Sequence, residues 1–107
     1  MTCPSHWEVR THLKTGEPVR RYIDWSPSDL PERTQHGVIG RPLREFEVCA
    51  DRIEITETWC HSSGHAEWYD SDPPRIVRRD DEAERSELAR RFGEQLAGEI
   101  ELAFSSL

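Results

Sequence analysis

The sequence has no long apolar run, and its aliphatic residues are few. No stretch of 18 consecutive apolar residues occurs, so we expect no segment that spans a bilayer. Leu, Ile, Val and Phe total 21 of 107 residues, a share close to that of disordered chains. Four tryptophans argue against disorder, because each brings a large area that folding can bury. We therefore expect a single folded domain over residues 1–107, with a small, aromatic-rich core.

Cysteine is scarce, and a secretory pattern is missing. An odd number of cysteines, three, does not indicate a disulfide framework. The first ten residues, MTCPSHWEVR, lack the charged and then apolar regions of a secretory signal. A cytoplasmic location is therefore expected.

Motifs for catalysis are lacking as well. Residues 37–40, GVIG, have neither the Lys-Ser/Thr ending nor the following helix of a phosphate-binding loop. Cys60 has His61 and His65 nearby in sequence, but no third group is placed to orient a nucleophile and base. Catalysis by paired carboxylates needs a cleft that shifts their pKa values, and a small sheet offers little depth for one. We therefore expect no enzymatic activity.

Alternation of apolar and polar residues predicts a sheet. Period-two alternation over residues 6–13 and 18–25, around a glycine turn, predicts a β-hairpin. A second hairpin is predicted over 46–59, and residues 66–69 follow as a neighbouring strand. Residues 26–42 are predicted to form a long loop, because they contain three prolines and two glycines. The face assigned to the core contains all four tryptophans, Trp7, Trp25, Trp59 and Trp68.

The C-terminal third changes to a helical period. Apolar residues recur at three or four positions from Leu88 to Phe104, and Asp81 with Glu84 suits a helix N-terminus. One long helix over about residues 81–104 is expected. The predicted fold is α+β, with a mostly antiparallel five-stranded sheet over about 6–70 whose tryptophan face the helix covers.

Acidic residues concentrate in the middle of the chain. The formal net charge is -7, and residues 43–74 hold eight acidic side chains against two basic ones. The predicted phasing turns four of these acids away from the helix, as part of a hydroxyl-bearing sheet face. Either this is an ordinary solvated face, or it recognises a basic partner by charge. Glu57 lies on the apolar phase, where it would either pair with Arg21 or lie at a margin of the sheet, and we expect the pairing.

The function predicted from these features is that of a small inhibitor that binds another protein. It would present its carboxylate-rich face to a basic, nucleic-acid-handling target. Phage anti-defence proteins such as anti-CRISPRs, and immunity proteins against nuclease toxins, share this size and charge, which is an analogy of physical type. Reversing the charge at Glu47 and Glu54 is expected to abolish binding and to leave the melting temperature nearly unchanged. The predicted partner-binding residues are Glu45, Glu47, Glu54, Glu67 and Tyr69, followed by Asp29, Glu32 and Arg33 of the long loop.

Two alternatives, a zinc-stabilised domain and a homodimer, remain open. A small zinc-stabilised domain or accessory subunit would use Cys3, His6, Cys60 and His65 as ligands, although their spacing is not that of a common zinc finger. Direct binding of nucleic acid is not expected, because the pI is about 5.2 and the helix arginines can pair at i,i+4 spacing, Asp81 with Arg85 and Glu87 with Arg91. An exposed sheet edge leaves a homodimer open.

Overall fold

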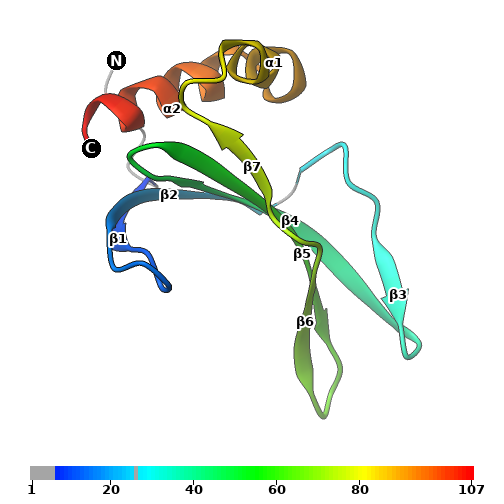
Figure 1. Cartoon of the computed structure of the whole chain (residues 1–107). Coiled ribbons are helices and arrows are strands. Elements are labelled where there is room, and N and C mark those ends of the chain that lie inside the picture. Colours follow the sequence, from blue (N-terminus) through cyan, green and yellow to red (C-terminus); the bar gives the residue numbers. More distant parts are fainter. Residues whose placement is uncertain (1–6, 26) are drawn as a thin grey trace.

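The computed structural model describes residues 7–25 and 27–107, which form two layers. A curved antiparallel sheet is covered on one face by two C-terminal helices (Figure 1). The strands are β1 (Glu8–Thr11), β2 (Pro18–Asp24), β3 (Arg33–Gln35), β4 (Val38–Val48), β5 (Arg52–Ser62), β6 (Glu67–Ser71) and β7 (Arg75–Arg78). The helices are α1 (Glu82–Phe92) and α2 (Glu94–Ser105).

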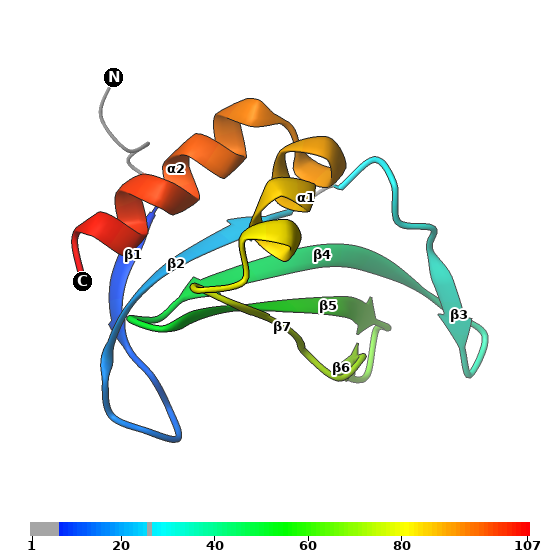
Figure 2. The same ribbon diagram turned by 45° about the horizontal axis from the view of Figure 1, so that its top comes forward.

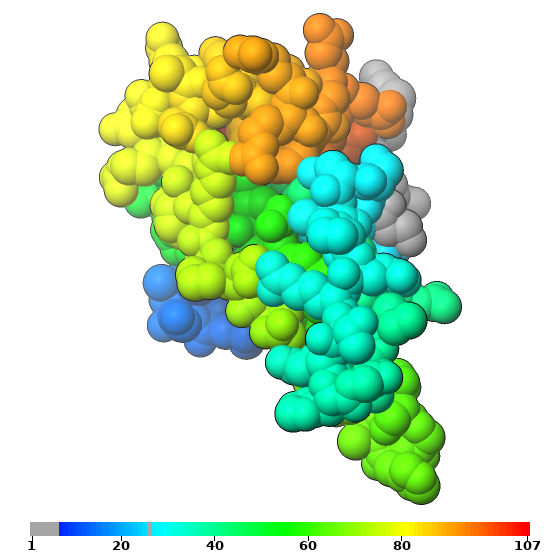
Figure 3. Space-filling view, turned by 90° about the vertical axis from the view of Figure 1, so that its right-hand side faces the viewer, coloured from blue at the N-terminus to red at the C-terminus, as the bar shows by residue number. Residues whose placement is uncertain are grey.

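The β4–β5 hairpin is the centre of the sheet. Near its turn it is flanked by β2 on the β4 side and by β7 on the β5 side, while β1 pairs with β2. Towards its open end, β3 pairs with β4 and β6 pairs with β5. This second part, residues 38–43 and 58–62 with β3 and β6, extends away from the helices (Figures 1 and 2) and is called the uncovered half. Figure 3 shows the same extension as a projection below the helical layer.

The core lies between the helices and the inner face of the hairpin. Phe46 and Ile55 are directly paired across the two central strands, and both are buried. Tyr22 stacks between Trp7 and Phe46, which carries the aromatic packing to the edge of the sheet. The helices contribute the apolar residues Leu88, Ile100, Ala103 and Phe104.

The α+β class and the antiparallel sheet are confirmed, but the number of strands is seven rather than five. One additional strand, β3, and the first residues of β4 lie in the predicted loop 26–42. Pro42 fits within β4 because pairing with β2 stops at Arg44 and pairing with β3 starts at Gly40. At that gap its missing N–H leaves no ladder bond unmade. The other additional strand, β7, follows Pro73 and Pro74, which were expected to end the sheet.

The predicted single helix is two helices that meet at Gly93. Gly93 has φ 94°, a conformation that residues with a side chain rarely adopt, so the helical path breaks there. The predicted N-terminus is confirmed, since the Asp81 side chain accepts a hydrogen bond from the Glu84 N–H at 3.1 Å. No helix in the described part of the chain is long and apolar enough to cross a membrane.

The predicted phase of β2 is wrong. Tyr22 faces the helices, whereas Trp25 lies on the opposite side of the sheet, the outer face, and is 67% exposed. The alternation misled because β2 buries apolar groups on both faces. Val19 is fully buried although it shares the outer phase with Trp25.

Two glycine substitutions test the packing. A Cβ on Gly98 in α2 would meet no atom within 4 Å, so Gly98→Ala is expected to raise the free energy of unfolding by about 1 kcal/mol through helix propensity.

A Cβ on Gly40 would lie 2.4 Å from Cε1 of His61, whose ring is buried and stacked on Trp68. Gly40→Ala is therefore expected to cost about 1–3 kcal/mol. Urea unfolding followed by tryptophan fluorescence measures both. A destabilised Gly98→Ala protein would contradict this packing.

Candidate protein-binding site

Three of the predicted acidic residues lie together on the outer face. Glu47 and Glu54 are directly opposite each other in the β4–β5 ladder, and Glu45 is two residues further along β4 on the same face. Glu67 and Tyr69 lie on β6 in the uncovered half, where the Tyr69 hydroxyl donates to Glu67 at 2.8 Å. The structure therefore groups Glu45, Glu47 and Glu54, and it places the other two apart from them.

A hollow of about 360 Å³ opens at these carboxylates, and we call it the acidic pocket. Its acidic wall comes from the central hairpin, and its apolar wall comes from the β1–β2 loop and from the chain around β7. Leu13 is fully exposed and Ile76 is 46% exposed, so the apolar wall is open to an incoming group. The residues that line it are His12, Leu13, Lys14, Glu45, Glu47, Glu54, Pro74 and Ile76.

His12 is the most buried side chain of this pocket, with 7% of its surface exposed. Its Nδ1 accepts hydrogen bonds from the backbone N–H groups of Lys14 at 3.1 Å and Thr15 at 3.2 Å. The ring proton must then be on Nε2, which lies 3.3 Å from both carboxylate oxygens of Glu54. The same nitrogen is 3.6 Å from Oε1 of Glu47.

Glu54 is held by a dense set of donors. Nε of Arg52 donates to it at 2.8 Å, and the same guanidinium contacts Glu17 at 3.0 Å and Asp51 at 2.8 Å. Burial by itself would raise the pKa of Glu54, but the hydrogen bonds from Arg52 and His12 together lower that pKa below its ordinary 4.5. Its carboxylate therefore anchors the β1–β2 loop to the sheet.

Glu45 is also neutralised. Nε of Arg21 lies 2.9 Å from Oε2 of Glu45, and both side chains are only partly exposed. The predicted pairing of Arg21 with Glu57 is therefore wrong, because the two residues lie on opposite faces of the sheet. Glu57 instead accepts from Arg44 at 2.8 Å on the inner face.

Glu47 has no such partner. In the part of the chain that the structure describes, no lysine or arginine forms an ion pair with it, although its side chain is only 19% exposed. Burial raises the pKa of Glu47, and the charges of Glu45 and Glu54 raise it further. The charges of His12 and Arg21 act in the opposite direction, and the net shift is upward although Arg21 lies opposite Glu47 in the ladder of β2 and β4. The fold thus holds a partly desolvated carboxylate at a cost in stability, which is typical of groups kept for function.

The predicted loop residues have separate positions. Asp29 accepts two hydrogen bonds from the buried guanidinium of Arg44, at 2.8 and 3.0 Å, and these bonds lower its pKa. Arg33 binds Asp72 and stacks over the ring of Trp59 at 3.4 Å from the centroid. Glu32 is exposed and borders another hollow of the outer face.

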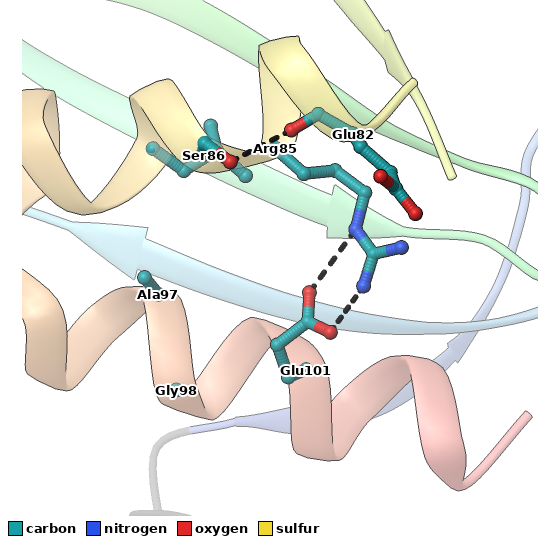
Figure 4. A pocket seen from close by; sticks show the side chains of 7 residues that line it. Glu82, Arg85, Ser86, Ala97, Gly98 and Glu101 are labelled. Atoms are coloured by element: carbon teal, nitrogen blue, oxygen red, sulfur yellow. Dashed lines mark hydrogen bonds and ion pairs between the residues drawn. The ribbon is translucent and has the colours of Figure 1, made fainter. Parts of the chain in front are cut away.

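A groove between the two helices carries charged groups that already satisfy each other (Figure 4). The guanidinium of Arg85 bonds both carboxylate oxygens of Glu101 and donates to the carbonyl of Arg79 at 2.7 Å. The predicted side-chain pairing of Arg85 with Asp81 is therefore replaced by a contact between α1 and α2. Glu87 pairs with Arg90 at i,i+3 spacing rather than with Arg91.

The zinc alternative falls partly outside the described residues, since Cys3 and His6 lie there. Among the described residues, the one group of three or more potential ligands within 4.8 Å is His12, Cys49 and Glu54, without Cys60 or His65. A metal on Nε2 of His12 would displace its proton, and Nδ1, which faces two N–H donors, cannot take that proton. Burial raises the pKa of the Cys49 thiol to about 12, so this thiol is protonated at neutral pH.

Sequence reasoning missed His12, Leu13 and Ile76 as parts of this site. His12 follows the polar phase of its strand, and nothing local indicates that it meets Glu54, 42 residues away. Ile76 belongs to β7, which was not predicted. The pocket arises from contacts between segments that are distant in the sequence, so no motif could have shown it.

A pair of isosteric substitutions tests the two carboxyls. Glu54→Gln removes charged hydrogen bonds and is expected to lower the free energy of unfolding at pH 7 by about 1–3 kcal/mol. Glu47→Gln is expected to raise the free energy of unfolding at pH 7. Folding raises the pKa of the Glu47 carboxyl, so its ionisation as the pH rises lowers the stability of the folded protein, and a glutamine does not ionise. The gain should shrink as the pH falls below the ordinary value of 4.5, where Glu47 becomes protonated in both the folded and the unfolded state. Urea titrations at pH 4 to 8 measure this; equal losses from both variants would contradict the assignment.

The expected insensitivity of the melting temperature to charge reversal does not fit this geometry. A lysine at position 54 would face Arg52 and the Nε2–H of His12, so a Glu47/Glu54 double reversal would weaken folding as well as any binding. Glu47 is the acid of the pair that can be changed without that complication.

Comparison with protein families, with curated proteins and with solved structures finds no match to this chain. The site is therefore described by its own geometry, a partly desolvated carboxylate in an acidic pocket with an apolar wall.

Proposed function

We propose that this chain acts by binding another protein that presents a basic surface, and that it has no catalytic activity of its own. The observation that supports this most directly is Glu47, a carboxylate that the fold partly shields from water and that forms no ion pair with a lysine or arginine of the described chain. The partner supplies the missing cation.

The acidic pocket suits a lysine or arginine side chain. Such a side chain has an apolar stem and a charged head, and it places the two in different surroundings. Leu13 and Ile76 offer the stem an apolar wall, while Glu47 faces the head. A cation bound there offsets the repulsion that Glu47 receives from Glu45 and Glu54. The ionised form of Glu47, which is unfavourable in the free protein, is therefore stabilised in the complex.

The net charge of -7 adds a long-range electrostatic attraction to the proposed binding. An acidic protein is attracted towards a basic surface before contact, which raises the association rate at low salt. Basic surfaces are typical of proteins that handle nucleic acid, because neutralised phosphates supply much of their affinity. The proposed role is therefore inhibition of such a protein, of the type that anti-CRISPRs and nuclease immunity proteins represent.

Acid–base catalysis is less well supported by the same residues. The pKa of Glu47 is raised and that of Glu54 is lowered, as in many catalytic carboxyl pairs. However, the Glu54 oxygens are already occupied by hydrogen bonds from Arg52 and His12. Glu54 is thus placed as a structural anchor and not as a base.

The test compares two variants that change the net charge equally. Glu47→Gln removes the charge of the acidic pocket, and Glu94→Gln removes an exposed charge at the start of α2. Proteins captured from a lysate of the source cell by the unaltered chain are eluted across a salt gradient and identified. Affinity for the purified partner is then measured with each variant.

We expect Glu47→Gln to weaken binding about 10-fold, equivalent to about 1.4 kcal/mol, and Glu94→Gln to weaken it less than about 3-fold. Because Glu47→Gln is expected to stabilise the fold, its loss of binding cannot be attributed to unfolding. A partner that resists high salt, or one that responds equally to the two variants, would overturn the proposal.

A further inference from the structure

A second hollow lies on the outer face, where the covered part of the sheet meets the uncovered half. It has a volume of about 400 Å³, and we call it the tryptophan pocket. Its walls are mainly apolar, with two charged side chains at the rim. The residues that line it are Trp25, Pro27, Glu32, Arg41, Pro42, Leu43 and Cys60.

The sheet topology creates this pocket. Pairing of β4 with β2 ends at Arg44, and pairing with β3 begins at Gly40, so residues 41–43 have no neighbouring strand on that edge. Trp25, directly after β2, and Pro27 line the hollow at this gap. The central hairpin supplies four of the lining residues, and the connection between β2 and β3 supplies the other three, Trp25, Pro27 and Glu32.

The surface around the tryptophan pocket has the composition of a binding hot spot. Trp25 is 67% exposed, Tyr69 is 64% exposed and Ile39 is 59% exposed. Cys60 is paired with Arg41 on one side and with Tyr69 on the other, which puts these residues in one row across the sheet. Trp, Tyr and Arg are the residues most enriched among those that dominate binding energy.

The tryptophan pocket and the acidic pocket are lined by neighbouring residues of β4. Leu43 lines the first and Glu45 lines the second, and the two are alternate residues on the same face of β4. From Glu47 to Leu43 is four residues along the strand, or about 13 Å at 3.3 Å per residue. A single extended segment of a partner can therefore reach both pockets.

We propose that the tryptophan pocket receives a bulky apolar side chain from the same partner segment that places a lysine or arginine in the acidic pocket. This inference rests on the proposed function and adds the chemistry of the recognised segment. In an extended partner segment, the basic and the apolar residue are four positions apart, because that spacing also spans about 13 Å. The exposed side chains of Glu32 and Arg41 remain at the rim, in contact with water.

Cys60 contributes to this site as an apolar surface. Burial and the charge of Glu67 raise the pKa of its thiol, so it is not a reactive thiolate. Its half-buried sulfur forms part of the wall against which the partner side chain packs.

The probe is a blocked peptide with the sequence Arg-Thr-Ser-Thr-Phe, titrated into the full ¹⁵N-labelled chain at low salt. Trp25→Phe identifies the indole N–H signal of Trp25. We expect the peptide to shift that signal together with the backbone signals of Glu45 and Glu47. Three further peptides replace Arg by Gln, replace Phe by Ala, or place Arg and Phe next to each other, and each is expected to bind at least about 5-fold more weakly.

Two protein variants complete the test. Trp25→Ala is expected to weaken binding of the parent peptide about 10-fold, whereas Leu102→Ala, which removes an exposed apolar side chain from α2, should leave it within about 2-fold. Trp25 is exposed, so its variant is expected to fold, and the unchanged signals of the core confirm this.

The outcomes separate the two proposals. If the Phe-to-Ala peptide binds as well as the parent and Trp25→Ala has no effect, while Gln in place of Arg abolishes binding, this inference is wrong and the acidic pocket stands. If no Arg-containing peptide shifts Glu45 or Glu47, both proposals are overturned. If binding needs Phe but not Arg, the acidic pocket is wrong and so is the two-pocket segment.

Discussion

The structure depends on a mismatch in length between the central hairpin and the helices above it. β4 has 11 residues and extends about 36 Å, whereas the 12 residues of α2 extend only about 18 Å. The helical layer therefore covers one part of the hairpin, where Phe46 and Ile55 form the core. The remainder is stabilised by the short strands β3 and β6 and by stacking such as that of His61 on Trp68. The uncovered half of the sheet adds exposed surface without enlarging the core, and such surface can contact a partner.

The same hairpin sets the charges of the outer face. Its register places Glu47 directly opposite Glu54, and like charges so placed destabilise a sheet unless something compensates them. Arg52 and His12 compensate Glu54, and Arg21 compensates Glu45. Glu47 receives less stabilisation from positive charges than its burial requires, so its carboxylate is easier to protonate than that of an ordinary glutamate. Carboxylates with pKa values raised in this way are frequent at functional sites, which is why Glu47 carries the proposed function.

Local patterns predicted the parts of the fold that local physics controls. The antiparallel hairpins followed from period-two alternation, and the start of α1 at Asp81 followed from its capping residues. The break at Gly93, the strand β7 after two prolines and the phase of β2 were not predicted, because each depends on packing between distant segments. The site shows the same division. Strand periodicity grouped Glu45, Glu47 and Glu54, but their neutralisation by Arg21, His12 and Arg52 could not be read from spacing, and neither could the two pockets.

Charge and shape make different contributions to recognition by such a face. An acidic pocket attracts any basic surface, so by itself it gives rapid and salt-sensitive association with little discrimination between partners. An apolar pocket beside an exposed tryptophan discriminates by size and shape, and its contribution resists salt. Leu43 and Glu45 place the two pockets side by side on β4, so a partner of the proposed kind would have to satisfy both at one spacing to bind well. That joint requirement would let a small, strongly acidic protein select one basic target among many and avoid binding every basic surface weakly.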